Sequence, residues 1–99
     1  HGASSVPQAF VEKCNSFGGV ITGAQGVPED MLRKAATMAV CKINIDTDLR
    51  LAMTASIREV LTNNPAEFDP RKYLGPAREA IQAMVQHKIK NVLGCNNKI

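Results

Sequence analysis

Apolar residues recur at helical spacing in four stretches of the chain, and turns rich in Gly, Pro and Asn separate them. This spacing predicts helices over residues 7–17, 28–38, 48–62 and 75–93. Pro28 and Pro76 are placed to open the second and fourth helices, and Gly94 is placed to end the last one as a left-handed cap. The pattern therefore predicts a chain that is mostly α-helical when taken alone.

Residues 39–45 break this pattern because their β-branched density, with Val40, Ile43 and Ile45, is typical of a strand. It is the single strand that the sequence predicts. One strand cannot pair its own edges, and each unpaired buried backbone group costs about 1–3 kcal/mol. The strand must then pair with another chain or belong to a larger sheet. A nearly continuous apolar strand that leads into a helix favours an α/β fold, with a parallel sheet covered by helices as in a barrel.

The same periodicity predicts which side chains are buried. In the third helix, with Asp48 as its cap, the expected stripe is Leu49, Met53, Ile57, Val60 and Leu61. In the last helix it is Ala77, Ile81, Met84, Val85, Ile89 and Val92. In the second helix it is Met31, Leu32, Ala35 and Ala36. His87 lies off its stripe and is expected on the surface, whereas the cysteines are expected to be buried as small hydrophobes.

Composition narrows the class of protein. A chain of 99 residues with 44% hydrophobic and 21% charged residues is one domain at most. The net charge of +3 is scattered and only four residues are aromatic, which argues against a nucleic-acid partner. No apolar run approaches the roughly 20 residues of a membrane span, and no signal segment opens the chain, so no membrane role is expected. Three widely spaced cysteines favour a reducing, cytoplasmic setting.

Candidate chemistry follows the predicted strand. Asn44 and Asp46 point to the same side of a strand, at the carboxyl end where barrel enzymes carry their active sites. The free amides of Thr47 and Asp48 at the start of the next helix would attract an anion. Alternatively, Asp46 and Asp48 are only two capping acids.

Two further stretches contain candidate ligands. The segment His1-Gly2-Ala3-Ser4-Ser5 combines a metal-capable imidazole with a flexible loop suited to an anion, although such a stretch taken alone is more often an ordinary chain end. Arg71 follows Asp69-Pro70 in a rigid turn, where its planar guanidinium could bind a phosphate through two hydrogen bonds. Most exposed arginines have no such role.

Together these motifs resemble one family. His-Gly-Ala-Ser-Ser-Val-Pro at 1–7, Gly-Val-Pro at 26–28, Lys-Ile-Asn-Ile-Asp-Thr-Asp-Leu-Arg-Leu-Ala at 42–52 and Phe-Asp-Pro-Arg-Lys-Tyr-Leu at 68–74 are similar to class II, zinc-dependent fructose-1,6-bisphosphate aldolases. The resemblance implies a TIM (β/α)8 barrel, which typically takes about 250 residues. Residues 1–99 would then be the C-terminal segment of that single domain.

The resemblance implies metal ligands near the start of the chain. His1 would be one histidine ligand of a catalytic zinc ion. Gly2 and Ser4 would help to bind a monovalent cation, Na+ or K+, and a substrate phosphate. The chain contains no second plausible zinc ligand, so we expect the 99 residues alone to be inactive.

The resemblance also implies roles toward a sugar phosphate. Asn44 would contact the enediolate formed from dihydroxyacetone phosphate, and the amides of Asp46 and Thr47 would hold its phosphate. Arg71 would reach the far phosphate of the bisphosphate from the neighbouring subunit of a homodimer.

The reaction implied is the reversible cleavage of fructose 1,6-bisphosphate to dihydroxyacetone phosphate and glyceraldehyde 3-phosphate. A tagatose-bisphosphate aldolase is an alternative within the same chemistry. A third hypothesis is a helical self-association fragment without catalysis, in which residues 40–45 pair across a dimer and cover its exposed apolar surface.

Overall fold

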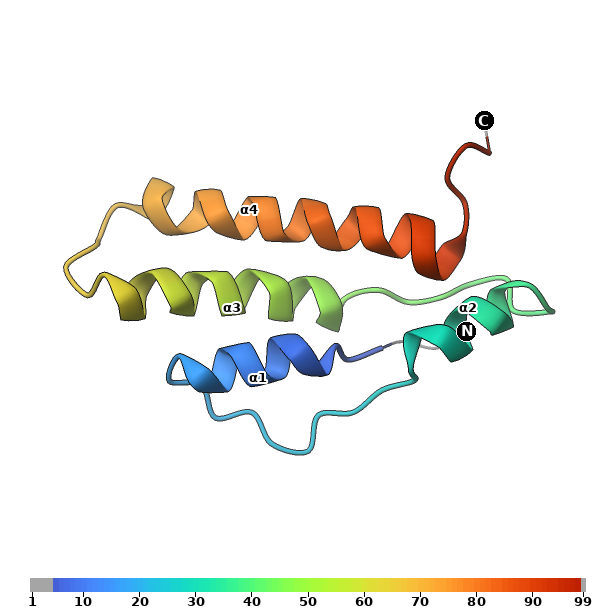
Figure 1. Ribbon diagram of the computed structural model, residues 1–99, viewed down its shortest axis with the longest axis horizontal. Coiled ribbons are helices and arrows are strands. Elements are labelled where there is room, and N and C mark those ends of the chain that lie inside the picture. Colours follow the sequence, from blue (N-terminus) through green and yellow to red (C-terminus); the bar gives the residue numbers. More distant parts are fainter. Residues whose placement is uncertain (1–4, 99) are drawn as a thin grey trace.

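Three helices lie side by side in one layer, and a fourth lies at one end of it (Figure 1). The computed structural model describes residues 5–98. The elements are α1 (Gln8–Ser16), α2 (Glu29–Ala36), α3 (Thr47–Asn63), α4 (Pro70–His87) and a π-helical segment, η1 (Lys88–Leu93), that directly continues α4. The four helices that the sequence predicts are all present.

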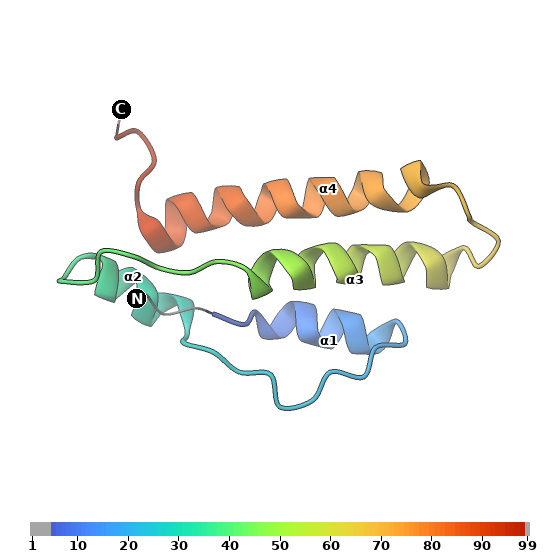
Figure 2. The same cartoon turned by 180° about the vertical axis from the view of Figure 1, so that it is seen from behind.

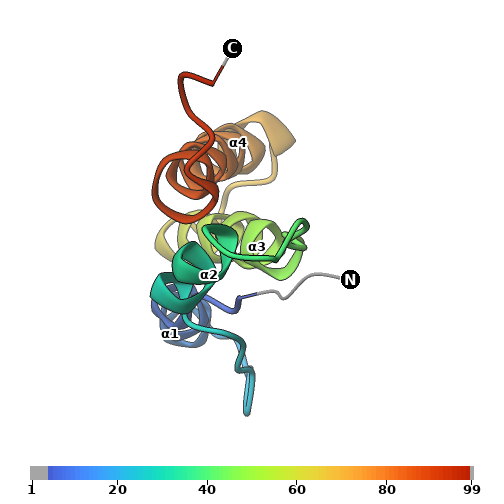
Figure 3. The same cartoon turned by 90° about the vertical axis from the view of Figure 1, so that its right-hand side faces the viewer.

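The layer is thin, and α3 lies in its middle. The principal extents are 50 × 34 × 18 Å, and the shortest is less than the width of two helices with their side chains, each about 10–12 Å across. α1 and α3 run in the same direction and α4 returns antiparallel to them, as the view from behind also shows (Figure 2). Figure 3, seen along the helices, shows α1, α3 and α4 stacked in one row.

The strand predicted at 39–45 does not form within residues 5–98. Residues 40–45 are extended but form no ladder, and residues 5–98 contain no strand at all. A strand needs a second segment to accept and donate its backbone hydrogen bonds, and no described segment of this chain lies beside 40–45 in that way. The segment therefore connects α2 to α3 with half-buried or exposed side chains.

The predicted start of the last helix, residue 75, is also wrong. α4 begins at Pro70, where the Oδ1 atom of Asp69 accepts a hydrogen bond of 3.0 Å from the amide of Arg71. Asp69-Pro70 is a cap followed by a first-turn proline, and this signal is stronger than Pro76. Pro76 lies inside α4, and Gly75 before it has no Cβ to collide with the proline ring. Gly94 does end η1 with φ +65°, so the predicted left-handed cap is confirmed.

α3 buries a different face from the one predicted. Its buried residues are Asp48, Leu51, Ala52, Ala55 and Ser56, which are mostly small. Leu51 and Ala55 pack against Val11 and Cys14 of α1. Small side chains let the neighbouring helices approach α3 closely, whereas the predicted stripe, Leu49, Met53, Ile57, Val60 and Leu61, stays half-buried or exposed. The sequence identified an apolar face of α3, but residues 5–98 cover it only in part.

The other predicted stripes are confirmed in part. Ala77, Met84 and Val92 are buried as expected, but Val85 is exposed. In α2, Leu32 is buried while Met31 is exposed. None of the helices within residues 5–98 is long and apolar enough to cross a lipid bilayer.

The cysteines give a direct test of this packing. Cys14 is fully buried, whereas Cys41 and Cys95 are exposed, so the prediction that all three are buried is wrong for two of them. Burial raises the pKa of the Cys14 thiol, although Arg58 and Lys13 oppose the shift. In the native protein, Cys95 should therefore react with iodoacetamide at least about ten times faster than Cys14. Peptide mass mapping of the alkylated protein measures this, and equal labelling of Cys14 would contradict the packing of α1 on α3.

Candidate functional site

The residues that precede α3 form the first candidate site. Asp46 is the residue before the helix, and its carbonyl accepts bonds of 3.0 Å from the amides of Leu49 and Arg50. Its carboxylate pairs with Arg50 Nε at 3.0 Å on the surface rather than capping the helix. Thr47, the first residue of α3, is exposed, and Asn44 is half-buried just before it. The first-turn amides of a helix start such as this one are groups that can bind an anion.

Asp48 is not the cap that the sequence predicts. It lies inside the first turn of α3, and its side chain is fully buried. The alternative that Asp46 and Asp48 are only two capping acids is therefore wrong, because the Asp46 side chain makes no cap hydrogen bond and Asp48 is buried inside the first turn.

Arg71 lies at the opposite end of the layer. It is in the first turn of α4, whereas Asn44, Asp46 and Thr47 lie at the start of α3, at the other end of the layer (Figure 1). The 17 residues of α3 lie between the two ends, and a helix of that length spans about 25 Å. The Nη2 atom of Arg71 donates a hydrogen bond of 2.7 Å to Asp69 Oδ2, and the Nε atom donates one of 3.2 Å to the same oxygen. These hydrogen bonds keep the pKa of Asp69 below its usual value. The Arg71 side chain remains 89% exposed. One chain therefore does not bring Arg71 to the other candidate residues.

The remaining predicted ligands, His1, Gly2 and Ser4, lie outside the described residues. Within residues 5–98, no three His, Cys, Asp or Glu side chains come together in a way that could hold a metal ion. The described part of the chain thus cannot form a zinc site by itself.

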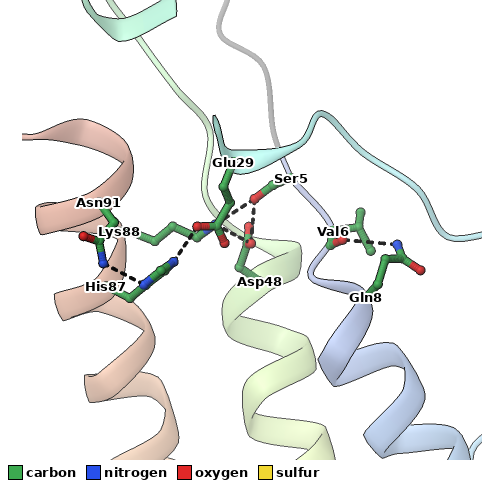
Figure 4. Close-up of polar contacts among 8 residues, drawn as sticks. All are labelled: Ser5, Val6, Gln8, Glu29, Asp48, His87, Lys88 and Asn91. Atoms are coloured by element: carbon green, nitrogen blue, oxygen red, sulfur yellow. Dashed lines mark hydrogen bonds and ion pairs between the residues drawn. The ribbon is translucent and has the colours of Figure 1, made fainter. Parts of the chain in front are cut away.

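A buried polar cluster that helical spacing did not predict lies beside the start of α3 (Figure 4). Its centre is Lys88, only 2% exposed, whose Nζ lies 2.7 Å from Asp48 Oδ1 and donates to Ser5 Oγ at 2.8 Å. The Ser5 hydroxyl donates to the same Asp48 oxygen at 2.7 Å. The other Asp48 oxygen is buried with no hydrogen-bond partner among the described residues.

The outer part of the cluster involves α2 and the end of α4. Lys88 Nζ donates to Glu29 Oε1 at 3.1 Å, and the other Glu29 oxygen contacts His87 Nε2. Asn91 Nδ2 lies 3.0 Å from His87 Nδ1. His87 is exposed as expected, but it is bonded on both ring nitrogens.

One signal in the sequence pointed to this cluster. Lys88 falls on the apolar stripe of the last helix, four residues after Met84 and four before Val92, and both of these are buried. A lysine on a buried face is rarely unpaired, so this position of Lys88 could have indicated a buried ion pair. Its partners lie 40 and 83 positions away, at Asp48 and Ser5, and helical spacing carries no information on contacts that distant.

Glu29 makes the cluster sensitive to acid. Burial opposes ionisation of its carboxyl, but the hydrogen bonds from His87 and Lys88 outweigh this and hold its pKa below the ordinary value of 4.5. Because the folded-state pKa is lowered, Glu29 stabilises the fold fully above about pH 4.5, and this contribution is lost as the pH falls through the lower folded value.

We therefore expect Glu29→Gln to lower the thermal midpoint at pH 7 and to make its fall between pH 5 and pH 3 shallower than in the parent protein. Asp30→Asn, a change at the exposed neighbour, serves as the control. Melting curves across this pH range measure the effect. Identical pH profiles for Glu29→Gln and the parent would show that Glu29 is not paired as described.

Comparison with known proteins places these features in context. Residues 8–98 match the family model described as Fructose-bisphosphate aldolase class-II. The chain is 58% identical over 94 residues to a fructose-bisphosphate aldolase of Treponema pallidum, 53% identical over 90 residues to that of Thermus caldophilus, and 49% identical over 90 residues to that of Giardia intestinalis. These alignments cover 95%, 91% and 91% of this chain. The chain spans only 28% to 30% of the length of these relatives.

Proposed function

The chain belongs to the class-II fructose-bisphosphate aldolase family, and we propose that it is the C-terminal segment of an enzyme that reversibly cleaves fructose 1,6-bisphosphate. The products would be dihydroxyacetone phosphate and glyceraldehyde 3-phosphate. The observation that carries this proposal is the match of residues 8–98 to the family, together with relatives of that name at 58% and 53% identity.

The shape of the chain supports its being part of a barrel. Its helices form one layer, with α1 and α3 running in the same direction and the extended segment 40–45 leading into α3 (Figure 1). In a (β/α)8 barrel, successive outer helices are parallel and each follows a strand of the inner sheet. We infer that residues 40–45 complete such a strand when the rest of the barrel lies beside them. The partly covered apolar stripe of α3 would then pack on that sheet.

Asn44, Asp46 and Thr47 would bind the three-carbon half of the substrate. The amides of Asp46 and Thr47 would hold its phosphate at the start of α3, where the helix dipole favours negative charge. The Asp46 carboxylate already pairs with Arg50, which lowers the repulsion between it and a phosphate. The Asn44 side-chain amide would donate to the oxygen on which charge develops when the carbon–carbon bond breaks.

We further propose that His1 is one ligand of a zinc ion and that Gly2 and Ser4 help to bind a monovalent cation. Zinc, when bound, would polarise the substrate ketone as a Lewis acid. A catalytic zinc ion usually has about three protein ligands, and residues 5–98 provide no cluster of this kind. The other ligands would therefore come from the part of the barrel outside this chain, which is why residues 1–99 alone should be inactive.

The experiment that tests the function is an assay of the full-length protein with zinc, using fructose 1,6-bisphosphate and tagatose 1,6-bisphosphate in parallel. Preference for the fructose substrate supports the proposal, and preference for tagatose bisphosphate would favour the alternative aldolase. Residues 1–99, assayed at the same molar concentration, are the matched control. Cleavage by this chain alone would contradict the need for the remaining barrel.

Arg71 should act on the far phosphate. In the full-length enzyme, Arg71→Ala is expected to raise KM for fructose 1,6-bisphosphate by about 10- to 100-fold, because a hydrogen bond to a charged group contributes about 1.5–3 kcal/mol. KM for fructose 1-phosphate, which lacks that phosphate, should change little. Steady-state kinetics with both substrates measure the difference, with exposed Lys72→Ala as the control. Equal effects on the two substrates would refute this role.

The position of Arg71, about 25 Å from the start of α3, favours its supply by a neighbouring subunit. Mixed dimers of Arg71→Ala and Asn44→Ala subunits test this. If the site is shared, one of the two sites in each mixed dimer contains both native residues, and activity at substrate concentrations well below the KM of Arg71→Ala rises on mixing. If each site is built from one chain, mixing restores nothing.

A further inference from the structure

Lys88 connects three segments that are far apart in the sequence. Its ammonium lies within 3.1 Å of oxygens from Ser5 ahead of α1, Glu29 at the start of α2 and Asp48 in the first turn of α3 (Figure 4). An ammonium has three N–H donors, so these three acceptors use all of them. Lys88 is 2% exposed and therefore has no bulk water to exchange with these partners.

Two of these segments adjoin the proposed substrate site. Asp48 directly follows Thr47 in the chain, and Ser5 directly follows Ser4. Asp48 Oδ1 accepts from both Ser5 and Lys88, and these bonds set the direction of its side chain and of the first turn of α3. The amides of Asp46 and Thr47 belong to the same helix start.

The helix that contains Lys88 changes its geometry at this residue. α4 ends at His87, and the π-helical η1 begins at Lys88. His87 and Lys88, although adjacent, each contact one oxygen of the same Glu29 carboxylate. Short π-helical segments are uncommon and frequently mark functional sites, because they redirect a side chain that a regular helix would point elsewhere.

Stability alone is a poor reason for this arrangement. A buried ion pair pays a desolvation cost, and apolar residues of similar volume often stabilise a fold as well or better. Directional bonds from one charged group to three segments instead fix how those segments lie relative to each other.

We propose that Lys88 is a positioning residue for substrate binding: it holds the start of α3 and the segment at Ser5 so that the site for the phosphate of dihydroxyacetone phosphate is formed before the ligand arrives. This inference rests on the proposed function. Lys88 touches no substrate and acts only through Asp48 and Ser5. A misplacement of about 1 Å at a binding or catalytic group can cost about 100-fold.

The test uses the full-length enzyme and measures Kd for dihydroxyacetone phosphate by titration calorimetry, together with kcat, KM and the thermal midpoint. Lys88→Met is expected to weaken dihydroxyacetone phosphate binding by about tenfold or more, in line with the effect of removing a group that orients a ligand. Lys90→Met, at an exposed lysine of the same segment η1, should bind as the parent does.

A second variant separates positioning from folding, because Lys88→Met leaves the buried Asp48 without its cation. Lys88→Met with Asp48→Asn removes both charges and should recover most of the lost thermal midpoint. Its Kd for dihydroxyacetone phosphate should stay about tenfold or more above that of the parent, since the link to three segments is still broken. Recovery of both the midpoint and the affinity would show a purely structural role and overturn the inference.

Two further outcomes are distinguishable. An active enzyme in which Lys88→Met binds dihydroxyacetone phosphate as Lys90→Met does would overturn this inference and leave the proposed function intact. A full-length parent protein that cleaves neither bisphosphate and does not bind dihydroxyacetone phosphate would overturn both.

Discussion

Replacing Asn44 with alanine in the full-length enzyme is expected to lower kcat by about 100- to 1,000-fold with little change in KM. Asn44 lies half-buried just ahead of the helix start that would hold the substrate phosphate. Its amide would meet full negative charge only when the carbon–carbon bond breaks. An interaction made mainly in the transition state affects turnover rather than substrate binding.

Steady-state cleavage of fructose 1,6-bisphosphate measures this loss. Thr54→Ala, a polar truncation on the exposed surface of α3, is the matched control and should behave as the parent. A large rise in KM with kcat unchanged would assign Asn44 to ground-state binding instead. Unchanged values for both constants would remove it from the site.

The second large effect is on stability. Lys88→Met should lower the free energy of unfolding by about 3–5 kcal/mol, because it leaves the fully buried Asp48 carboxylate without its cation. Methionine has a similar length and fills the same space, so packing changes little and the electrostatic effect dominates. The loss should be smaller when Asp48→Asn accompanies the change.

Urea denaturation of the full-length protein, followed by circular dichroism, measures the shift in the midpoint. Lys90→Met should stay within about 0.5 kcal/mol of the parent, as exposed substitutions usually do. A shift for Lys88→Met no larger than that of Lys90→Met would mean that Lys88 and Asp48 are not paired in solution.

Local signals in the sequence predicted much of the fold correctly. α1, α2 and α3 begin and end within two residues of the predicted bounds, and Gly94 ends η1 in the left-handed conformation expected of it. The motifs around residues 42–52 and 68–74 resembled the class II aldolases, and the comparison with that family confirms the resemblance. These features depend on interactions between residues a few positions apart in the sequence. Hydrophobic periodicity, helix caps and turn motifs are patterns of the same short range, so they predict such features directly.

The incorrect predictions of the strand and of the buried face of α3 have one physical cause. Residues 40–45 have the composition of a strand, but a strand forms only beside a partner. The apolar stripe of α3 is covered only in part, because the small residues Ala52, Ala55 and Ser56 form the close contacts. Hydrophobic periodicity identifies a face that can be buried, and it does not say whether the surface that buries it is present.

Some features of the candidate site likewise follow from local sequence, and others depend on the tertiary structure. The sequence by itself determined which residues are candidates for phosphate binding, through the order of Asn44, Asp46 and Thr47 around a helix start and of Arg71 after Asp69-Pro70. Only the tertiary structure showed that Arg71 lies at the far end of the layer, and that Lys88 joins Ser5, Glu29 and Asp48. The reason is the range of the interactions: turns and helix starts are set by adjacent residues, whereas a buried charge is paired by whichever segments the packed fold brings within about 3 Å of it.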